Sequence, residues 1–215
     1  MSDQIVIQSP ATPDCLVLLF HGVGSTPENL VPLGQRLAAA KPGATVISVQ
    51  SPDRCDMGTG WQWFSVRGIT EENRRARVSS TMDRFVRTVR DLQHRSGLTA
   101  PQTILIGFSQ GGIMALESSL LADAPAGRVV SLSGRFVKLP QHAPASTAVN
   151  FLHGDRDTVI DPAWSTSAAQ QLQRLGADVT CDIVRNLGHG LNEEIVATLL
   201  QRMPTGQAVY SEIGK

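Results

Sequence analysis

Residues 103–117 constrain the fold of this chain more than any other stretch. A continuous apolar run at 104–106 is typical of a parallel strand that is covered on both faces. Residues 113–121 favour a helix and include neither Gly nor Pro. Between the two lies the pattern Gly-x-Ser-x-Gly, centred on Ser109. The stretch therefore predicts a buried strand, a tight turn around one serine, and a helix.

The spacing of this turn suits a nucleophilic serine. A serine at a strand-to-helix turn adopts a strained backbone conformation that raises its hydroxyl above the edge of the sheet. We expect side chains at Gly107 and Gly111 to collide with the neighbouring strand and helix, so that both positions require glycine. The amide of Gln110, at the start of the helix, would lie where negative charge develops during attack on a carbonyl.

Strands and helices alternate along the rest of the chain. Further strands are predicted at 4–8, 15–20, 44–49, 129–132, 149–152 and 179–184. Further helices are predicted from Pro27 to a stop at Pro42-Gly43, and at 71–95, 162–175 and 192–201. No repeat or low-complexity linker divides the chain. We therefore predict a single α/β domain over 1–215, with a mostly parallel sheet of about seven strands and helices on both faces.

Charge and composition exclude several other classes of protein. The 215 residues include 19 basic and 19 acidic side chains, and this balance argues against a dedicated nucleic-acid-binding protein. The N-terminus lacks a basic segment followed by an apolar core, and the longest apolar run, 15–20, is too short to cross a bilayer. We therefore expect a cytoplasmic protein without a signal peptide or an integral membrane segment. We expect its three cysteines to be unpaired thiols that do not form a metal site.

Candidates for the groups that activate Ser109 follow it in the chain. A serine hydroxyl needs a base to take its proton, and the base needs a third group to fix its tautomer. When the serine lies at such a strand-to-helix turn, the nucleophile, the acid and the base follow one another in the chain as Ser, Asp or Glu, then His. His189 is the predicted base, because it lies in a Gly-flanked loop beyond the last strand. His142 and His153 also follow Ser109, and we expect His153 to be packed or hydrogen-bonded.

The orienting acid should follow the strand at 149–152. Asp155, Asp157 and Asp161 all qualify by position. We favour Asp157, because Asp155 lies at the start of the turn, where it can accept hydrogen bonds from backbone amides as an Asx-type cap.

A second glycine-punctuated exit from a strand lies at 21–24. The amide of Val23 is therefore the predicted partner of the amide of Gln110 in an oxyanion hole. His21 is expected to hold this loop in place and not to react.

A long loop at 50–68 contains Trp61, Trp63 and Phe64, although the chain is only 5% aromatic. Loops of this length in a compact domain are usually functional. We expect these aromatics to line an acyl groove. The alternative, that they attach the loop to the core, is equally open for each of them.

Several segments resemble the phospholipase/carboxylesterase family of α/β-hydrolases, which includes small bacterial carboxylesterases and acyl-protein thioesterases. They are 19–24, 107–112, 153–157 and 188–189, and 63–74 is closer still to bacterial YpfH-type esterases. The resemblance covers nearly the whole chain and implies an α/β-hydrolase fold; no insertion is large enough for a cap domain. It also implies a nucleophile, an orienting acid, a base and two oxyanion amides at Ser109, Asp157, His189, Val23 and Gln110 respectively.

We therefore predict a serine carboxylesterase that hydrolyses short- to medium-chain esters of small molecules through an acyl-enzyme on Ser109, without a metal or organic cofactor. An acyl-protein thioesterase or lysophospholipase is the alternative within the enzyme class. Thioesterases usually carry acids where this chain has Ser25 and Ser65, which favours the general esterase. A catalytically silent binding module is the alternative of another class, and the full set of triad candidates argues against it. A monomer and a homodimer both remain open.

Overall fold

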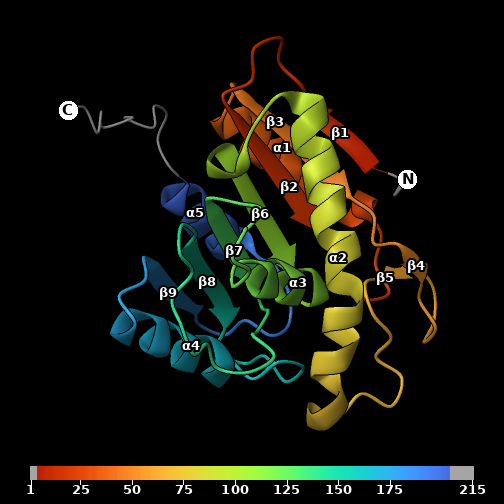
Figure 1. The fold of residues 1–215 in the computed structure, drawn as a ribbon, viewed down its shortest axis with the longest axis vertical. Coiled ribbons are helices and arrows are strands. Elements are labelled where there is room, and N and C mark those ends of the chain that lie inside the picture. Colours follow the sequence, from red (N-terminus) through yellow and green to blue (C-terminus); the bar gives the residue numbers. More distant parts are fainter. Residues whose placement is uncertain (1–3, 204–215) are drawn as a thin grey trace.

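A seven-stranded sheet lies at the centre of the computed structural model, which describes residues 4–203 (Figure 1). Its strand order is β1-β3-β2-β6-β7-β8-β9, and every neighbouring pair is parallel except β1 and β3. The strands are β1 (Gln4–Gln8), β2 (Cys15–Phe20), β3 (Ala44–Val49), β6 (Thr103–Phe108), β7 (Arg128–Leu132), β8 (Ala148–Gly154) and β9 (Val179–Val184). The prediction of a mostly parallel sheet of about seven strands is confirmed.

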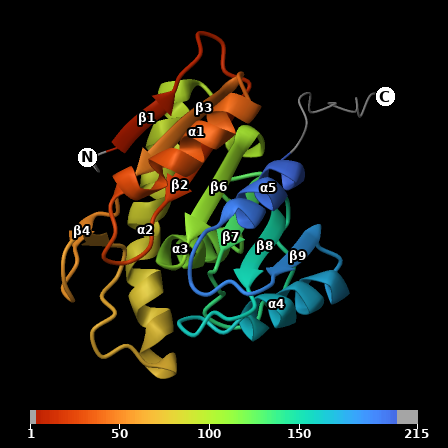
Figure 2. The same ribbon diagram turned by 180° about the vertical axis from the view of Figure 1, so that it is seen from behind.

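Helices cover both faces of this sheet. One face carries α2 (Glu71–Ser96), α3 (Gln110–Ser118) and α4 (Ala163–Arg174). The other face, seen in Figure 2, carries α1 (Val31–Ala40) and α5 (Glu193–Arg202). Two short 3-10 helices, η1 (Pro27–Leu30) and η2 (Ala100–Gln102), precede α1 and β6. No large cap domain is inserted among residues 4–203.

Alternate residues of the buried strands supply two separate hydrophobic cores. In β2, Leu16, Leu18 and Phe20 pack on the side of α2 and α3, whereas Val17 and Leu19 pack on the side of α1 and α5. All five side chains are fully buried. Because burial of one such side chain stabilises the fold by about 1.5–3 kcal/mol, this double coverage fixes the sheet firmly.

Most predicted boundaries lie within one or two residues of those in the structure, and larger differences occur at the helix after Ser109 and in the loop at 50–68. The helix after Ser109 begins at Gln110, ahead of the apolar residues that predicted it, because it starts directly from the turn. The loop at 50–68 contains a small antiparallel pair, β4 (Asp53–Arg54) and β5 (Trp61–Gln62). Strands of two residues show no sequence periodicity, so they were expected as irregular structure.

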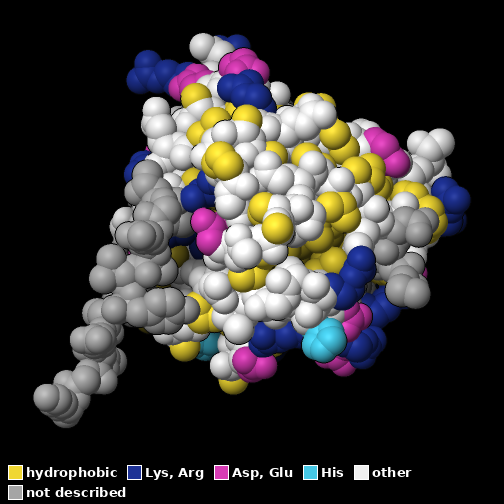
Figure 3. Space-filling view, turned by 90° about the horizontal axis from the view of Figure 1, so that it is seen from above, with side chains coloured by type: hydrophobic (Ala, Val, Ile, Leu, Met, Phe, Trp, Pro, Cys, Tyr) yellow, Lys and Arg dark blue, Asp and Glu magenta, His cyan; other side chains and the backbone are white. Residues whose placement is uncertain are grey.

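The outer surface carries charges of both signs. Figure 3 views the face above the amino ends of the parallel strands and shows acidic and basic side chains interspersed around its rim, with apolar groups between them. Among residues 4–203, no helix is both long and apolar enough to cross a lipid bilayer. Cys15, Cys55 and Cys181 are all free thiols, as expected.

Candidate active site

Ser109 lies in the turn between β6 and α3, at the carboxyl edge of the sheet. Its φ of 52° and ψ of −114° place it in a region that L-residues rarely occupy, so the predicted backbone strain is present. A Cβ on Gly107 would lie 2.3 Å from the carbonyl oxygen of Gly111, and one on Gly111 would lie 2.2 Å from the carbonyl oxygen of Phe20. Both glycines are therefore sterically required, as predicted.

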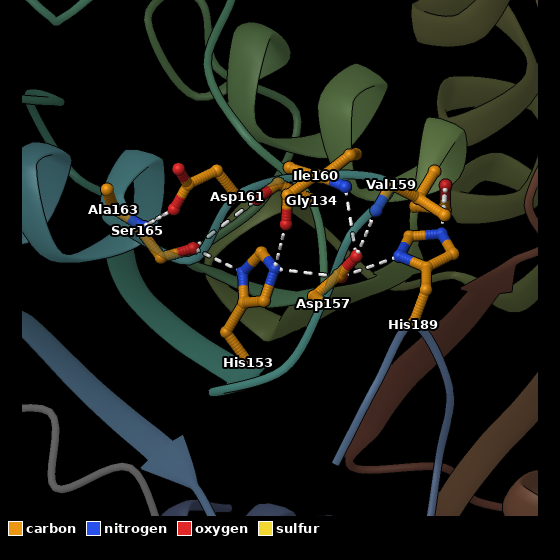
Figure 4. Close-up of polar contacts among 10 residues, drawn as sticks. Gly134, His153, Asp157, Val159, Ile160, Asp161, Ala163, Ser165 and His189 are labelled. Carbon is orange, nitrogen blue, oxygen red and sulfur yellow. Dashed lines mark hydrogen bonds and ion pairs between the residues drawn. The ribbon is translucent and has the colours of Figure 1, made fainter. Parts of the chain in front are cut away.

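Ser109, His189 and Asp157 come from three loops and form one line of hydrogen bonds. The Ser109 Oγ lies 2.9 Å from Nε2 of His189. Nδ1 of His189 lies 2.6 Å from Oδ2 of Asp157, a contact that Figure 4 shows. A carboxylate oxygen only accepts, so Nδ1 of His189 carries a proton. In the neutral ring, Nε2 is then unprotonated and faces the serine hydroxyl.

Four hydrogen bonds hold the fully buried Asp157 carboxylate. Its Oδ1 accepts from the amides of Val159 and Ile160, at 2.8 and 2.9 Å. Its Oδ2 accepts from His189 and from Nε2 of His153, which is 3.0 Å away. Burial alone raises the pKa of Asp157, but the hydrogen bonds from His189 and the two amides outweigh burial and hold this pKa below its ordinary value. The carboxylate is therefore ionised at neutral pH.

The turn after β8 differs in one respect from the prediction. We expected Asp155 to cap the backbone amides of this turn, but that prediction is wrong: Asp155 is exposed, and Asp157 itself accepts from the amides two and three residues ahead. One carboxylate can do both, because Oδ1 caps the turn while Oδ2 faces the histidine. Asp161, the third candidate, accepts from the amide of Ala163 at the start of α4.

His153, at the end of β8, belongs to this network in a way that the sequence did not reveal. Its Nε2 lies near two acceptors, Oδ2 of Asp157 at 3.0 Å and the carbonyl oxygen of Ile160 at 2.9 Å, so Nε2 carries the proton. Its Nδ1 lies 2.8 Å from Oγ of Ser165 (Figure 4). Burial lowers the pKa of His153, and the ring stays neutral. The prediction that it is hydrogen-bonded is correct, but its partner was not foreseen.

The loop after β2 brings Val23 beside the nucleophile. A Cβ on Gly22 would lie only 3.2 Å from Cβ of Ser109. Within residues 4–203, the N–H of Val23 makes no hydrogen bond. The N–H of Gln110 is the first of α3, where no preceding carbonyl of the helix can accept it. Two backbone donors are therefore available to an oxygen bound next to Ser109.

His21 holds this loop from inside, as expected. Its Nε2 accepts from the amide of Ser51 at 3.1 Å, so the proton lies on Nδ1, which is 2.7 Å from the carbonyl oxygen of Gly22. Burial lowers the pKa of His21 and keeps the ring neutral.

A cavity of about 490 Å³ opens beside Ser109. Its apolar lining includes Ile69, Ile113, Ile160 and Trp164, and a charged wall contains Glu71, Arg74 and Arg135. Within residues 4–203, no three His, Cys, Asp or Glu side chains are arranged to hold a metal ion.

Of the three aromatics predicted to line an acyl groove, only Phe64 borders this cavity. Trp63 is fully buried and packs in the core, with its ring centroid 5.0 Å from that of Phe85. Trp61 belongs to β5, and the guanidinium of Arg54 lies 4.0 Å from the centroid of its ring. The alternative interpretation, that the aromatics attach the loop to the core, describes Trp63, and Phe64 also belongs to the buried core, whereas Trp61 is only partly buried and packs against Arg54 of the same loop.

The side chain of Gln110 fixes the position of this loop, a role that the sequence analysis missed. Its Oε1 accepts from the amide of Trp63, and its Nε2 donates to the carbonyl oxygen of Phe64, each at 2.7 Å. The residue is 2% exposed. The cavity wall and the start of α3 are thus joined by two buried hydrogen bonds.

Known proteins resemble this chain over most of its length. The model of the phospholipase/carboxylesterase family matches residues 2–204. The esterase YpfH of Escherichia coli K12 is 44% identical over 202 residues, which cover 94% of this chain and 87% of that protein. Acyl-protein thioesterase 1 of Neurospora crassa is 25% identical over 93% of this chain and 91% of its own length. The crystal structure of esterase PE8 matches with a TM-score of 0.84 and 27% identity, over 93% of this chain and 95% of that chain.

Proposed function

This chain belongs to the phospholipase/carboxylesterase family and is a carboxylic ester hydrolase, and we propose that it acts through an acyl-enzyme on Ser109. The observation that carries the proposal is the unbroken line from the Ser109 hydroxyl through His189 to Asp157, with contacts of 2.9 and 2.6 Å. A serine hydroxyl becomes an effective nucleophile when a base takes its proton, and an acid that orients the base completes a catalytic triad.

In the proposed reaction, Oγ of Ser109 attacks the ester carbonyl carbon while Nε2 of His189 takes the hydroxyl proton. Asp157 keeps the ring in the required tautomer and stabilises the imidazolium that forms. The amides of Val23 and Gln110 donate to the oxygen of the tetrahedral intermediate, and one such donor typically lowers the barrier by about 3 kcal/mol.

His189 then donates its proton to the departing alcohol as the bond between carbon and alcohol oxygen breaks. A water molecule then attacks the carbonyl carbon of the acyl-enzyme while Nε2 of His189 takes one proton from the water. As the bond to Ser109 Oγ breaks, His189 returns this proton to Oγ, and the acid and the free serine hydroxyl are formed. No step in this scheme uses a metal or an organic cofactor.

A short- to medium-chain ester of a small molecule is the proposed substrate. The cavity volume of about 490 Å³ supports an acyl group of modest size. A series of p-nitrophenyl esters from C2 to C16 tests this, and a preference for the longest chain would contradict it. We also propose a cytoplasmic location, which the three free cysteines favour.

Thioester hydrolysis is the second candidate, supported by the similarity to Acyl-protein thioesterase 1. Competition between a palmitoyl thioester and a butyrate ester for the purified enzyme separates the two activities. Faster turnover of the thioester would replace the first proposal with the second.

Replacement of Ser109 by Ala tests the central proposal. We expect p-nitrophenyl butyrate hydrolysis to fall by at least about a thousandfold, because the acyl-enzyme cannot form. A fluorophosphonate probe should label the wild-type protein and fail to label S109A. Ser80→Ala, on the exposed side of α2, is the matched control and should keep full activity. Activity of S109A within tenfold of wild type, or no labelling of the folded wild type, would overturn the mechanism.

A further inference from the structure

Arg74 is a largely buried cation in the wall of the cavity that contains Ser109. We propose that Arg74 forms an anion-binding subsite, and that the preferred substrates are esters that carry a carboxylate group in addition to the ester bond. This inference rests on the proposed function of Ser109. It adds a substrate class, the half-esters of dicarboxylic acids and the esters of hydroxy acids.

The charged wall is built on Arg135, which is firmly anchored. Arg135 is 5% exposed, and its guanidinium stacks on Trp164, 3.3 Å from the ring centroid. It donates to the carbonyl oxygens of Phe136 and Val137, both at 3.0 Å. Its remaining contacts are a two-pronged ion pair with Glu71, at 3.1 and 2.8 Å. The carboxylate of Glu71 therefore serves mainly to neutralise the charge of the Arg135 guanidinium.

The charge of the Arg74 guanidinium is neutralised much less well than that of Arg135. Its only side-chain hydrogen bond within residues 4–203 runs to Oε1 of Glu71, the oxygen that also accepts from Arg135, over 3.2 Å. Charge-assisted bonds of this kind are usually about 2.7–2.9 Å long. The side chain of Arg74 is only 18% exposed, and its Nε is buried without a partner in the described part of the chain. A buried polar group in this state calls for a ligand or water that completes it.

The balance of charge around the cavity points the same way. Two guanidinium groups, of Arg74 and Arg135, share one carboxylate, that of Glu71. The other acid of the lining, Asp161, is exposed, accepts from the amide of Ala163, and forms no ion pair with either arginine among residues 4–203. Among the described residues that line the cavity, Glu71 is therefore the only acid paired with these arginines, and a carboxylate on the substrate would give Arg74 an acceptor that it does not share with Arg135.

Arg74 and Ser109 border the same cavity, so one small molecule can contact both. Figure 1 shows the first turn of α2, which carries Glu71 and Arg74, beyond the arrowheads of the parallel strands, the side on which Ser109 lies. The structure does not require the carboxylate to be on the acyl side or the alcohol side, and the experiment treats each in a separate arm.

The test compares kcat/KM for matched pairs of esters. In the acyl arm, 4-nitrobenzyl half-esters of butanedioic, pentanedioic and hexanedioic acid are compared with analogues whose distant carboxylate is a carboxamide. In the alcohol arm, butyrate esters of hydroxy acids are compared with the corresponding hydroxy amides. We expect the carboxylate to be preferred by about tenfold in at least one arm. R74Q should reduce kcat/KM for the carboxylate-bearing ester by about tenfold. It should change kcat/KM for the matched carboxamide-bearing ester less than twofold.

Arg75→Gln is the matched control, because Arg75 is the exposed neighbour on the same helix and does not border the cavity. It should leave both members of each pair unchanged. Equal or better turnover of the amides in both arms would overturn the inference, as would an equal loss of both substrates in a folded R74Q protein. In those outcomes the carboxamide-bearing esters are still hydrolysed in a way that depends on Ser109, so the proposed function stands. If the proposed function itself fails, hydrolysis of every ester becomes independent of Ser109.

Discussion

Nε2 of His153 donates a hydrogen bond over 3.0 Å to Oδ2 of Asp157, the oxygen that also receives Nδ1 of His189. Asp157 is thus held between two imidazoles, one facing Ser109 and one facing the interior. The inner ring is fully buried and is itself fixed by Ser165. His153 therefore fixes the direction in which Asp157 presents its carboxylate to His189.

His153→Phe should lower kcat for p-nitrophenyl butyrate by about tenfold and leave KM nearly unchanged. Phe occupies a similar volume but removes one donor to a buried carboxylate, and such bonds are worth about 1.5–3 kcal/mol. His153→Gln, whose amide nitrogen can reach the same oxygen, should recover part of kcat. Steady-state kinetics on folded protein measure both variants. Equal kcat in H153F and wild type would show that this contact does not orient Asp157.

Gly111→Ala should destabilise the protein by at least about 2 kcal/mol. Its Cβ would lie 2.2 Å from the carbonyl oxygen of Phe20, and backbone can relieve such overlap only by moving. Gly190→Ala is the control, because nothing lies within 4 Å of the added atom. Urea unfolding followed by circular dichroism gives both free energies. A G111A protein as stable as G190A would contradict the steric requirement at this turn.

The free energy of unfolding should fall as the pH drops below about 6.5. Burial lowers the pKa of His21 and of His153 in the folded state from the ordinary value of 6.5, so the unfolded chain takes up protons that the folded chain does not. Stability therefore increases with pH through the window just below 6.5, by up to about 1.4 kcal/mol per pH unit for each histidine.

Urea titrations at several pH values between 7.5 and 5 measure this slope. H153Q should have a smaller slope than wild type. A slope that H153Q leaves as steep as in wild type would assign the effect to other groups.

Gln110→Ala should destabilise the loop at 61–64 without removing the nucleophile. The change leaves the buried amide of Trp63 and the carbonyl of Phe64 without partners, and each such loss costs about 1–3 kcal/mol. The backbone amide of residue 110 remains, so fluorophosphonate labelling of Ser109 should persist. Gln141→Ala, at an exposed position, is the control for stability. Complete loss of labelling in folded Q110A would contradict this division between side chain and amide.

Much of the fold is local enough to be predicted from sequence. The apolar run at 15–20 is short and bounded by polar and glycine residues, which is typical of a strand buried on both faces, and β2 has those limits. Gly107 is required by the backbone of Gly111 and Gly112, which are close to it in the sequence, whereas Gly111 is required by the backbone of Phe20 on the neighbouring strand β2. The order of Ser109, Asp157 and His189 predicted which residues meet, because parallel strands bring their carboxyl ends to one edge.

The missed features depend on which neighbour a side chain meets in three dimensions. The sequence shows that Trp61, Trp63 and Phe64 are crowded, but only the fold turns Trp63 into the core and Phe64 toward the cavity. The bonds from Gln110 to that loop cross 46 and 47 positions of the chain. His153 and Asp157 are four residues apart, yet nothing in their spacing says that a strand end and a turn bring ring and carboxylate together.

The two groups that must share a proton in the proposed reaction lie 80 positions apart along the chain. The strand that precedes His189 is β9, an outer strand of the sheet, which pairs with β8. During synthesis on the ribosome, the serine and its strained turn therefore emerge long before the imidazole. If the proposed mechanism holds, a nascent chain cannot hydrolyse an ester until translation has passed β9 and His189.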